Sequence, residues 1–213
     1  MLPATSSARH TLAFMLLLWV ALLSGCDSAG ESAPEPDPAS YMPLEVGNTW
    51  TYRFLTGTDV GAVVSDQVTI DGTAYFAVTT QVAPFPITLR TTDDGRLWYV
   101  NDGSEYLLAD FTWREDDAPM VDLGAPRPNF PDDLSTVYTV AVERNLRVTT
   151  PAGTFDNALR LRYTLPELDD EAFSYTFAPN AGIIQIRRGL SGDRPLFQMS
   201  SGTIGGESVG DGS

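Results

Sequence analysis

The chain has 213 residues, of which 43% are hydrophobic and 19% charged, and this length predicts one domain with short flanking segments. The 13 basic residues, all of them arginines, face 28 Asp and Glu residues, and the net charge of −15 excludes a non-specific binder of nucleic acid or of anionic lipid headgroups. One cysteine cannot form an intrachain disulfide, so a disulfide scaffold is excluded as well.

The N-terminus has the features of a targeting segment. Arg9 and His10 precede an unbroken apolar run over residues 12–23. A membrane-spanning helix needs about 20 residues, so this run fits the apolar region of a signal peptide instead. The next residues, Leu23-Ser24-Gly25-Cys26, resemble the lipobox of bacterial lipoproteins. The resemblance implies cleavage before Cys26, acylation of Cys26 and attachment to a lipid bilayer of the bacterial cell envelope, on its periplasmic or surface side. The alternative is an ordinary cleaved signal peptide with a chance cysteine.

Composition divides the chain into four parts. Residues 1–25 are the predicted lipoprotein signal peptide. Residues 26–40 hold the lipidated cysteine and an acidic, proline-rich stretch that buries too little apolar surface to order itself, so we expect a disordered tether. Residues 41–204 form a single all-β domain, and residues 205–213 are expected to be a flexible tail.

Antiparallel strands are predicted throughout the folded part. Asp71-Gly72, Asp94-Gly95 and Asp102-Gly103 each separate β-rich runs, and Asp-Gly is a leading signal for a two-residue hairpin. Apolar and polar residues alternate within the runs, which is typical of strands. A curled antiparallel sheet follows, either a sandwich or an open barrel. The expected strands lie at 49–55, 60–70, 73–82, 87–92, 96–101, 105–111, 137–145, 146–150, 154–165, 173–178, 183–188 and 196–204.

Residues 112–136 interrupt this pattern with four prolines. So long a loop is uncommon in a compact domain and is usually functional or flexible. It contains Trp113, Met120, Leu123 and Phe130, which favours packing against the domain. We interpret it as a flap over an open end or face of the sheet, or as a plain crossover between two sheets.

Two stretches resemble motifs of uncharacterised bacterial envelope lipoproteins. One is the PLEVGNTWTY stretch at 43–52, and the other is TPAGTF at 150–155 followed by APNAGII at 178–184. The resemblance carries no activity or catalytic residues over to this chain, because none is established for that group. The residue types indicate structural roles: Pro151 to Gly153 and Pro179 to Gly182 suit tight turns, and Asn48 suits a turn cap before apolar residues enter the core.

The chemistry left after processing is narrow. His10 leaves with the signal peptide and Cys26 is acylated, and the chain has no lysine, so catalytic triads, Schiff bases and ordinary zinc sites are excluded. We therefore expect no enzyme, no metal and no cofactor. Carboxylates allow a glycosidase as a distant alternative, and calcium binding is a fairer hypothesis than the glycosidase although no calcium-loop spacing is present. The acidic clusters are Asp93-Asp94, Glu115-Asp116-Asp117, Asp132-Asp133 and Glu167 with Asp169-Asp170-Glu171.

These observations favour a membrane-anchored, non-catalytic binding or assembly module that contacts another envelope component. The alternative is a carrier of a hydrophobic ligand, such as lipid, inside the curled sheet. The aromatic residues Trp98, Tyr99, Tyr106 and Trp113 are candidates for a binding surface, although core packing is their commoner role. The expected partners are the bilayer, through Cys26, and an envelope protein or a lipid ligand, with no nucleic acid.

Overall fold

The structure is a computed structural model that describes residues 34–82, 86–124, 136–165, 172–188 and 195–210. The chain divides into two compact units, Met1–Glu35 and Pro36–Ser213. The predicted signal peptide, Cys26 and residues 27–33 of the predicted tether lie outside the described residues. None of the helical segments in the described ranges is long and apolar enough to cross a membrane.

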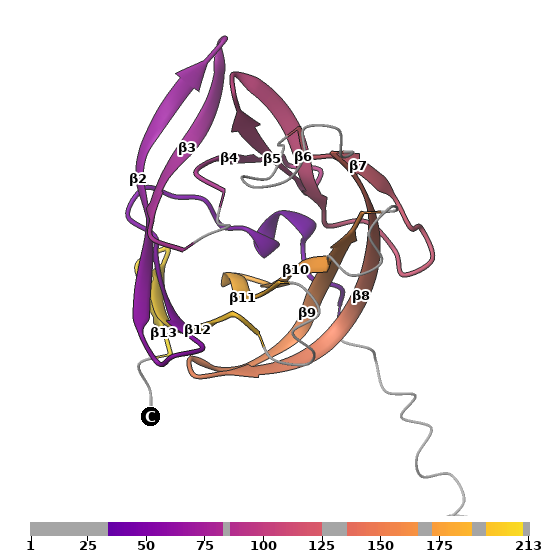
Figure 1. Cartoon of the computed structure of the whole chain (residues 1–213). Helices are drawn as coiled ribbons and strands as arrows, with labels where there is room; N and C mark the ends of the chain where they lie inside the picture. The colour runs from indigo at the N-terminus through magenta and orange to yellow at the C-terminus, as the bar shows by residue number, and fades with distance from the viewer. Residues whose placement is uncertain (1–33, 83–85, 125–135, 166–171, 189–194, 211–213) are drawn as a thin grey trace, which may run out of the picture. The chain divides into compact units, whose positions relative to one another are not determined.

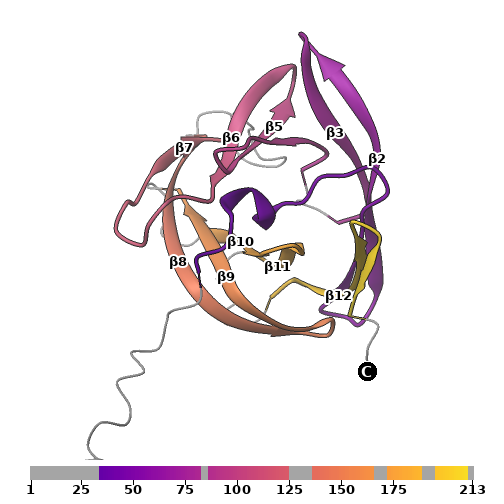
Figure 2. The same ribbon diagram turned by 180° about the vertical axis from the view of Figure 1, so that it is seen from behind.

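The second unit consists almost entirely of antiparallel strands, which confirms the predicted all-β class (Figures 1 and 2). Its one described helix, η1, is a single 3-10 turn. In chain order the elements are η1 (Pro38–Tyr41), β1 (Thr49–Phe54), β2 (Asp59–Ile70), β3 (Thr73–Thr80), β4 (Thr88–Thr91), β5 (Arg96–Asn101), β6 (Ser104–Asp110), β7 (Met120–Asp122), β8 (Val137–Thr150), β9 (Gly153–Thr164), β10 (Ala172–Ala178), β11 (Gly182–Arg188), β12 (Phe197–Ile204) and β13 (Glu207–Val209).

The strands form one continuous sheet in the order β6-β5-β4-β3-β2-β1-β12-β11-β10-β9-β8-β7, and β13 pairs with β12 off this path. The two end strands meet. Gly124, just after β7, packs against the ring of Tyr106 in β6, and the Tyr99 hydroxyl donates a hydrogen bond to the Leu123 carbonyl. The sheet of this unit is therefore curled into a nearly closed barrel, which decides between the two predicted architectures.

Two of the three Asp-Gly pairs form the predicted two-residue hairpins. In each, the aspartate and the glycine both have positive φ angles, with values of 50° and 81° at Asp71-Gly72 and 47° and 75° at Asp102-Gly103. The prediction is wrong for Asp94-Gly95, where Thr92 closes a wider turn: its amide donates to the Arg96 carbonyl and its carbonyl accepts from Gly95. Asp94 is thus left outside the left-handed region that a two-residue turn requires.

Residues 137–150 form one strand, although the sequence predicted two. Asn145 has a φ of 53°, and the register with β9 shifts between Glu143 and Leu146. A bulge of this kind disrupts the period-two pattern without ending the strand, because the ladder resumes on the far side. The predicted boundary at 145/146 marks this bulge.

The interior of the barrel is filled by side chains from nearly every strand. The largest fully buried ones are Trp50, Tyr52, Tyr163, Phe111 and Phe177. Aromatic rings pack edge to face or stacked through much of this core; the rings of Tyr163 and Phe173, for example, stack with centroids 4.8 Å apart. These buried side chains occupy the interior positions of the sheet in the described ranges.

The predicted tether is ordered at its end. Pro38–Tyr41 forms η1, whose ribbon lies within the ring of strands in Figures 1 and 2. Tyr41 and Met42 are 2% and 1% exposed, the Tyr41 hydroxyl donates to the Asn157 carbonyl over 2.8 Å, and the Asn180 amide donates to the Ser40 carbonyl over 2.8 Å. Composition suggested disorder up to residue 40, but these contacts lie far away in sequence and composition does not reveal them.

The predicted tail and loop each contain a short strand. Residues 207–209 form β13 because Gly205 and Gly206, with φ angles of 57° and 83°, turn the chain back onto β12. Residues 120–122 form β7 and pair with β8, so this part of the predicted flap belongs to the sheet itself. Residues 125–135, which include Phe130, lie outside the described residues.

Candidate functional site

The two sequence motifs come together inside the barrel and have structural roles there. Trp50 donates a hydrogen bond from Nε1 to the Ala181 carbonyl over 2.7 Å, and the Tyr52 hydroxyl donates to the Ile183 carbonyl over 2.8 Å. A Cβ at Gly182 would lie 3.0 Å from Trp50 Nε1, so the absence of a side chain there admits the indole. The aromatic residues of the first motif are thus fixed by the backbone of the second.

Asn48 is the turn cap that the sequence predicted. Its Nδ2 donates to the Pro43 carbonyl over 3.0 Å, and its Oδ1 accepts from the Gly205 amide over 2.9 Å. The second contact also joins the start of β1 to the turn before β13. In the other motif, Ala152 in the turn between β8 and β9 donates from its amide to the Met199 carbonyl over 3.0 Å. The polar groups of Asn48 and Ala152 are therefore used in hydrogen bonds that stabilise the fold.

The acidic clusters in the described ranges lie in exposed turns. Asp93 and Asp94 are exposed, as are residues 115–117, and no group of three or more potential metal ligands was found among the described residues. A hydrogen bond from Thr92 lowers the pKa of Asp94, whereas a glycosidase acid needs a raised pKa. Residues 132–133, 167 and 169–171 lie outside the described residues.

The four candidate aromatic residues divide between the two faces of the sheet. Tyr99 and Tyr106 face the interior, with ring centroids 5.8 Å apart, and help to join β6 to β7. Trp113 packs against the core, and its carbonyl accepts a hydrogen bond from Arg144 Nη1. Trp98 differs from the other three. It lies between Leu97 and Tyr99 on β5, and both of these side chains face the core. Because successive residues of a strand point to opposite faces, Trp98 lies on the outer face of the sheet.

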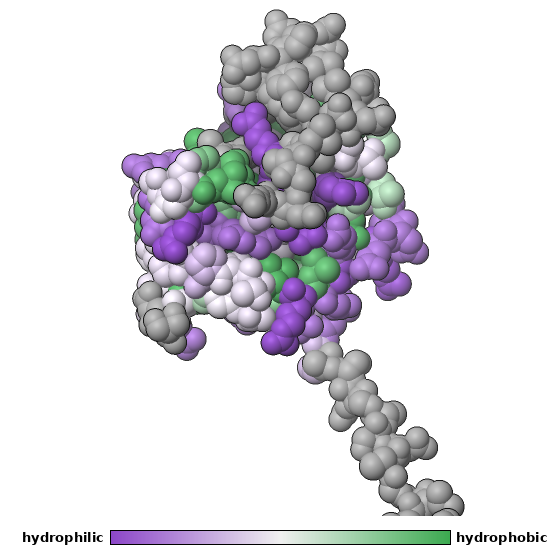
Figure 3. Space-filling model, turned by 60° about the horizontal axis from the view of Figure 1, so that its bottom comes forward, coloured by the Kyte–Doolittle hydropathy of each residue, from purple (hydrophilic) through white to green (hydrophobic). Residues whose placement is uncertain are grey.

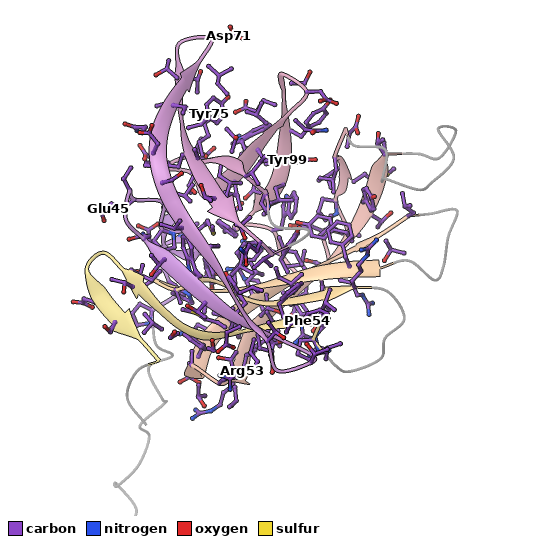
Figure 4. The ribbon with its side chains drawn as sticks, turned by 60° about the vertical axis from the view of Figure 1, so that its left-hand side comes forward. Glu45, Arg53, Phe54, Asp71, Tyr75 and Tyr99 are labelled. Carbon is purple, nitrogen blue, oxygen red and sulfur yellow. The ribbon has the colours of Figure 1, made fainter. Side chains whose placement is uncertain are left out.

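Trp98 belongs to a cluster on the outside of strands β3–β6, which we call the outer aromatic patch: Tyr75, Arg90, Trp98 and Glu105. Cross-strand partners share a face, and Arg90 pairs with Trp98. The next pair along the same two strands, Leu89 with Tyr99, faces the core instead. The patch is thus the reverse side of the sheet from the core, and Figure 4 shows Tyr75 on β3 below the hairpin tip at Asp71.

A bidentate ion pair lies at the centre of the outer aromatic patch. Arg90 donates from Nε to Glu105 Oε1 over 2.6 Å and from Nη2 to Oε2 over 2.9 Å. The Tyr75 hydroxyl donates to the same Oε1 over 2.7 Å. The Arg90 and Glu105 side chains remain 23% and 30% exposed, so the pair is ordered and yet accessible from solvent.

The Arg90 guanidinium also contacts two aromatic rings. Its Cζ lies 5.8 Å from the ring centroid of Tyr75 and 5.5 Å from that of Trp98, within range of a cation–π interaction. Hydrogen bonds from Arg90 lower the pKa of Glu105, and burial together with the bond to Glu105 raises the pKa of Tyr75. At neutral pH the carboxylate is therefore charged and the phenol is neutral.

Aliphatic side chains extend the patch along the same face. Register places four half-buried residues beside it, and none of them belongs to the main core: Val68, Ile70, Val100 and Leu107. Figure 3 shows one face of the molecule, on which hydrophilic and intermediate residues are mixed with small groups of hydrophobic ones. A group of aromatic, aliphatic and arginine side chains on a sheet exterior is a candidate binding surface.

The sequence contains part of the signal for this site. It identified Trp98 as a binding candidate but grouped it with three aromatic residues that serve the interior. Strict alternation in 96–100 could have separated Trp98 from Tyr99. No local pattern singles out Tyr75, Arg90 and Glu105, because their meeting depends on the pairing of four strands.

No protein-family model matches the chain, and no curated protein does. Among solved structures, one similar chain is described as a "putative exported protein with YmcC-like fold" from Bacteroides fragilis, with 12% identity, a TM-score of 0.38, and coverage of 75% of this chain and 97% of that one. Another is described as a "putative lipoprotein" from Parabacteroides distasonis, with 15% identity, a TM-score of 0.31, and coverage of 76% and 98%.

Proposed function

We propose that this protein is a bacterial cell-envelope lipoprotein, anchored through an acylated Cys26, whose β unit is a non-catalytic binding or assembly module. The observation that carries the proposal is the outer aromatic patch. Tryptophan, tyrosine and arginine are the residue types that most often dominate protein–protein interfaces. Here all three lie together on the face of the sheet that the core does not use, with Arg90 and Trp98 partly exposed and Tyr75 buried beneath them.

The filled interior supports a binding function on the outside of the barrel. A carrier of hydrophobic ligands needs an apolar space of several hundred Å³. In the described ranges the interior positions are occupied by large side chains, and η1 adds Tyr41 and Met42 to them. We therefore favour the binding module over the lipid carrier, and native mass spectrometry of the Pro36–Ser213 unit should show the bare polypeptide mass. A lipid-sized mass lost on denaturation would favour the carrier.

The lipobox resemblance supports the anchor. Replacing Cys26 with serine removes the thiol that the lipid would modify, and more than one acyl chain is needed for stable membrane attachment. We expect the wild-type chain in the membrane fraction of cells and the Cys26→Ser chain to lose this attachment. Equal membrane association of the two chains after a high-salt wash would contradict the anchor.

Photo-crosslinking in intact cells tests the binding surface. A photoreactive amino acid replaces Val100, which borders the patch, or Thr51, which lies on the outer side of β1 and serves as the matched control position. We expect a defined adduct at position 100 that weakens at least fivefold in a Trp98→Ala background. Absence of an adduct at 100, or an equal adduct at 51, would contradict the proposal.

A further inference from the structure

We infer that the partner of the outer aromatic patch is a protein with a basic surface around an apolar centre. The inference rests on the proposed function and adds the chemical class of the partner. It follows from the charges that surround the patch.

Both arginines on this face are already neutralised. Arg90 is bound by Glu105 through two hydrogen bonds. Arg96 lies two residues before Trp98 on β5 and therefore on the same face of the sheet. Its Nη1 lies 3.1 Å from Asp94 Oδ2, and its Nε lies 3.1 Å from Asp110 Oδ2. Neither guanidinium is therefore available to attract an acidic partner without losing a carboxylate that it already binds.

Several carboxylates around the patch have no such compensation. Residues 60–110 contain seven carboxylates and two arginines, an excess of five negative charges. Asp66 pairs with Ala77 across β2 and β3 and so lies on the patch face. Asp71, Asp93 and Asp102 lie in the turns that join the strands of this part of the sheet. Among the described residues these four exposed aspartates take part in no ion pair: Asp66, Asp71, Asp93 and Asp102.

The combination selects the class of partner. Uncompensated carboxylates repel nucleic acid, anionic lipid and a second copy of this acidic chain, and they attract lysine and arginine. The patch spans four strands, roughly 15 Å at the usual strand spacing, which is wider than a metal ion or a single ammonium group needs. Its aromatic centre requires an apolar counterpart, so an interface on another protein fits best.

Charge reversal in the full-length chain tests this inference. Asp66 and Asp93 are suitable because both are exposed and neither has the positive φ angle found at Asp71 and Asp102. The Asp66→Lys/Asp93→Lys variant is compared with Asp116→Lys/Glu207→Lys, which changes the net charge equally at exposed positions outside the patch. The readout is the adduct formed in intact cells by the photoreactive residue at position 100, with the contacted partner residue identified by mass spectrometry.

We expect the patch variant to lower the adduct at least fivefold and the control variant to change it less than twofold. Lys→Glu replacements beside the contacted partner residue should restore the adduct with the patch variant. An adduct of unchanged yield in the patch variant, or a contacted surface with excess acid, would overturn the inference and leave the proposed binding surface standing. Absence of any adduct from position 100 contradicts the proposed function itself.

Discussion

The hydrogen bond from Tyr52 to Ile183 offers a direct test of how the two sequence motifs stabilise the barrel. The Tyr52→Phe change removes one oxygen atom and leaves the ring in place. Both partners are fully buried, and the hydroxyl lies 2.8 Å from the carbonyl oxygen that it serves. Losing such a bond costs about 1 kcal/mol, and a buried carbonyl left short of a donor adds to this, so we expect a loss of about 1–2 kcal/mol.

Urea unfolding followed by tryptophan fluorescence measures this difference. All the described core residues lie in Pro36–Ser213, so this unit is used without the preceding segment. Tyr106→Phe is the matched control, because it removes the same atom from a half-exposed tyrosine whose hydroxyl makes no hydrogen bond within the described residues. The unfolding free energy should fall for Tyr52→Phe and change by less than about 0.5 kcal/mol for Tyr106→Phe. Equal values for the two variants would refute the reasoning.

Three further predictions concern the closure of the barrel and its pH dependence. Gly124→Ala should lower the unfolding free energy by more than about 2 kcal/mol, because its methyl group would overlap the Tyr106 ring. Gly57→Ala is the control: nothing lies near its added methyl group, so it should cost only about 1 kcal/mol of backbone strain. Similar urea midpoints for the two variants would contradict the closure of the barrel at Gly124. Burial raises the pKa of Tyr163 above its ordinary value of 10.0, so the unfolded state loses its proton first and stability should fall as the pH rises above 10. Tyr163→Phe should make the fall shallower in urea titrations between pH 9 and 12, and parallel curves would count against it. The pKa of Glu105 is lowered, so its contribution is present above its ordinary value of 4.5 and is lost as the pH falls below it; Glu105→Gln should flatten the acid limb of the same titration, and an unchanged limb would argue that the ion pair adds no stability.

Much of the fold could be predicted because strands and hairpins depend on local patterns. Alternation of polar and apolar residues over 49–54 or 96–101 predicts a strand wherever its partners lie. Asp71-Gly72 predicts a tight turn because both positions need positive φ angles. The type of each element therefore followed from a few neighbouring residues.

Errors arose where the chain depends on distant partners. β7 and β13 have three residues each, too few for a periodic pattern, and they are strands because β8 and β12 pair with them. η1 is ordered because Tyr41 reaches a carbonyl 116 residues away. No local property of these segments distinguishes them from a loop, a tail or a tether.

The candidate site shows the same division. By itself the sequence determined the acidic charge and the all-β class, and it predicts the anchor at Cys26. Tertiary structure alone decided that Tyr75, Arg90 and Glu105 meet beside Trp98, because their strands come together through the register of the sheet. A one-residue shift in that register would turn these side chains to the other face, so their meeting is a property of strand pairing that no single segment contains.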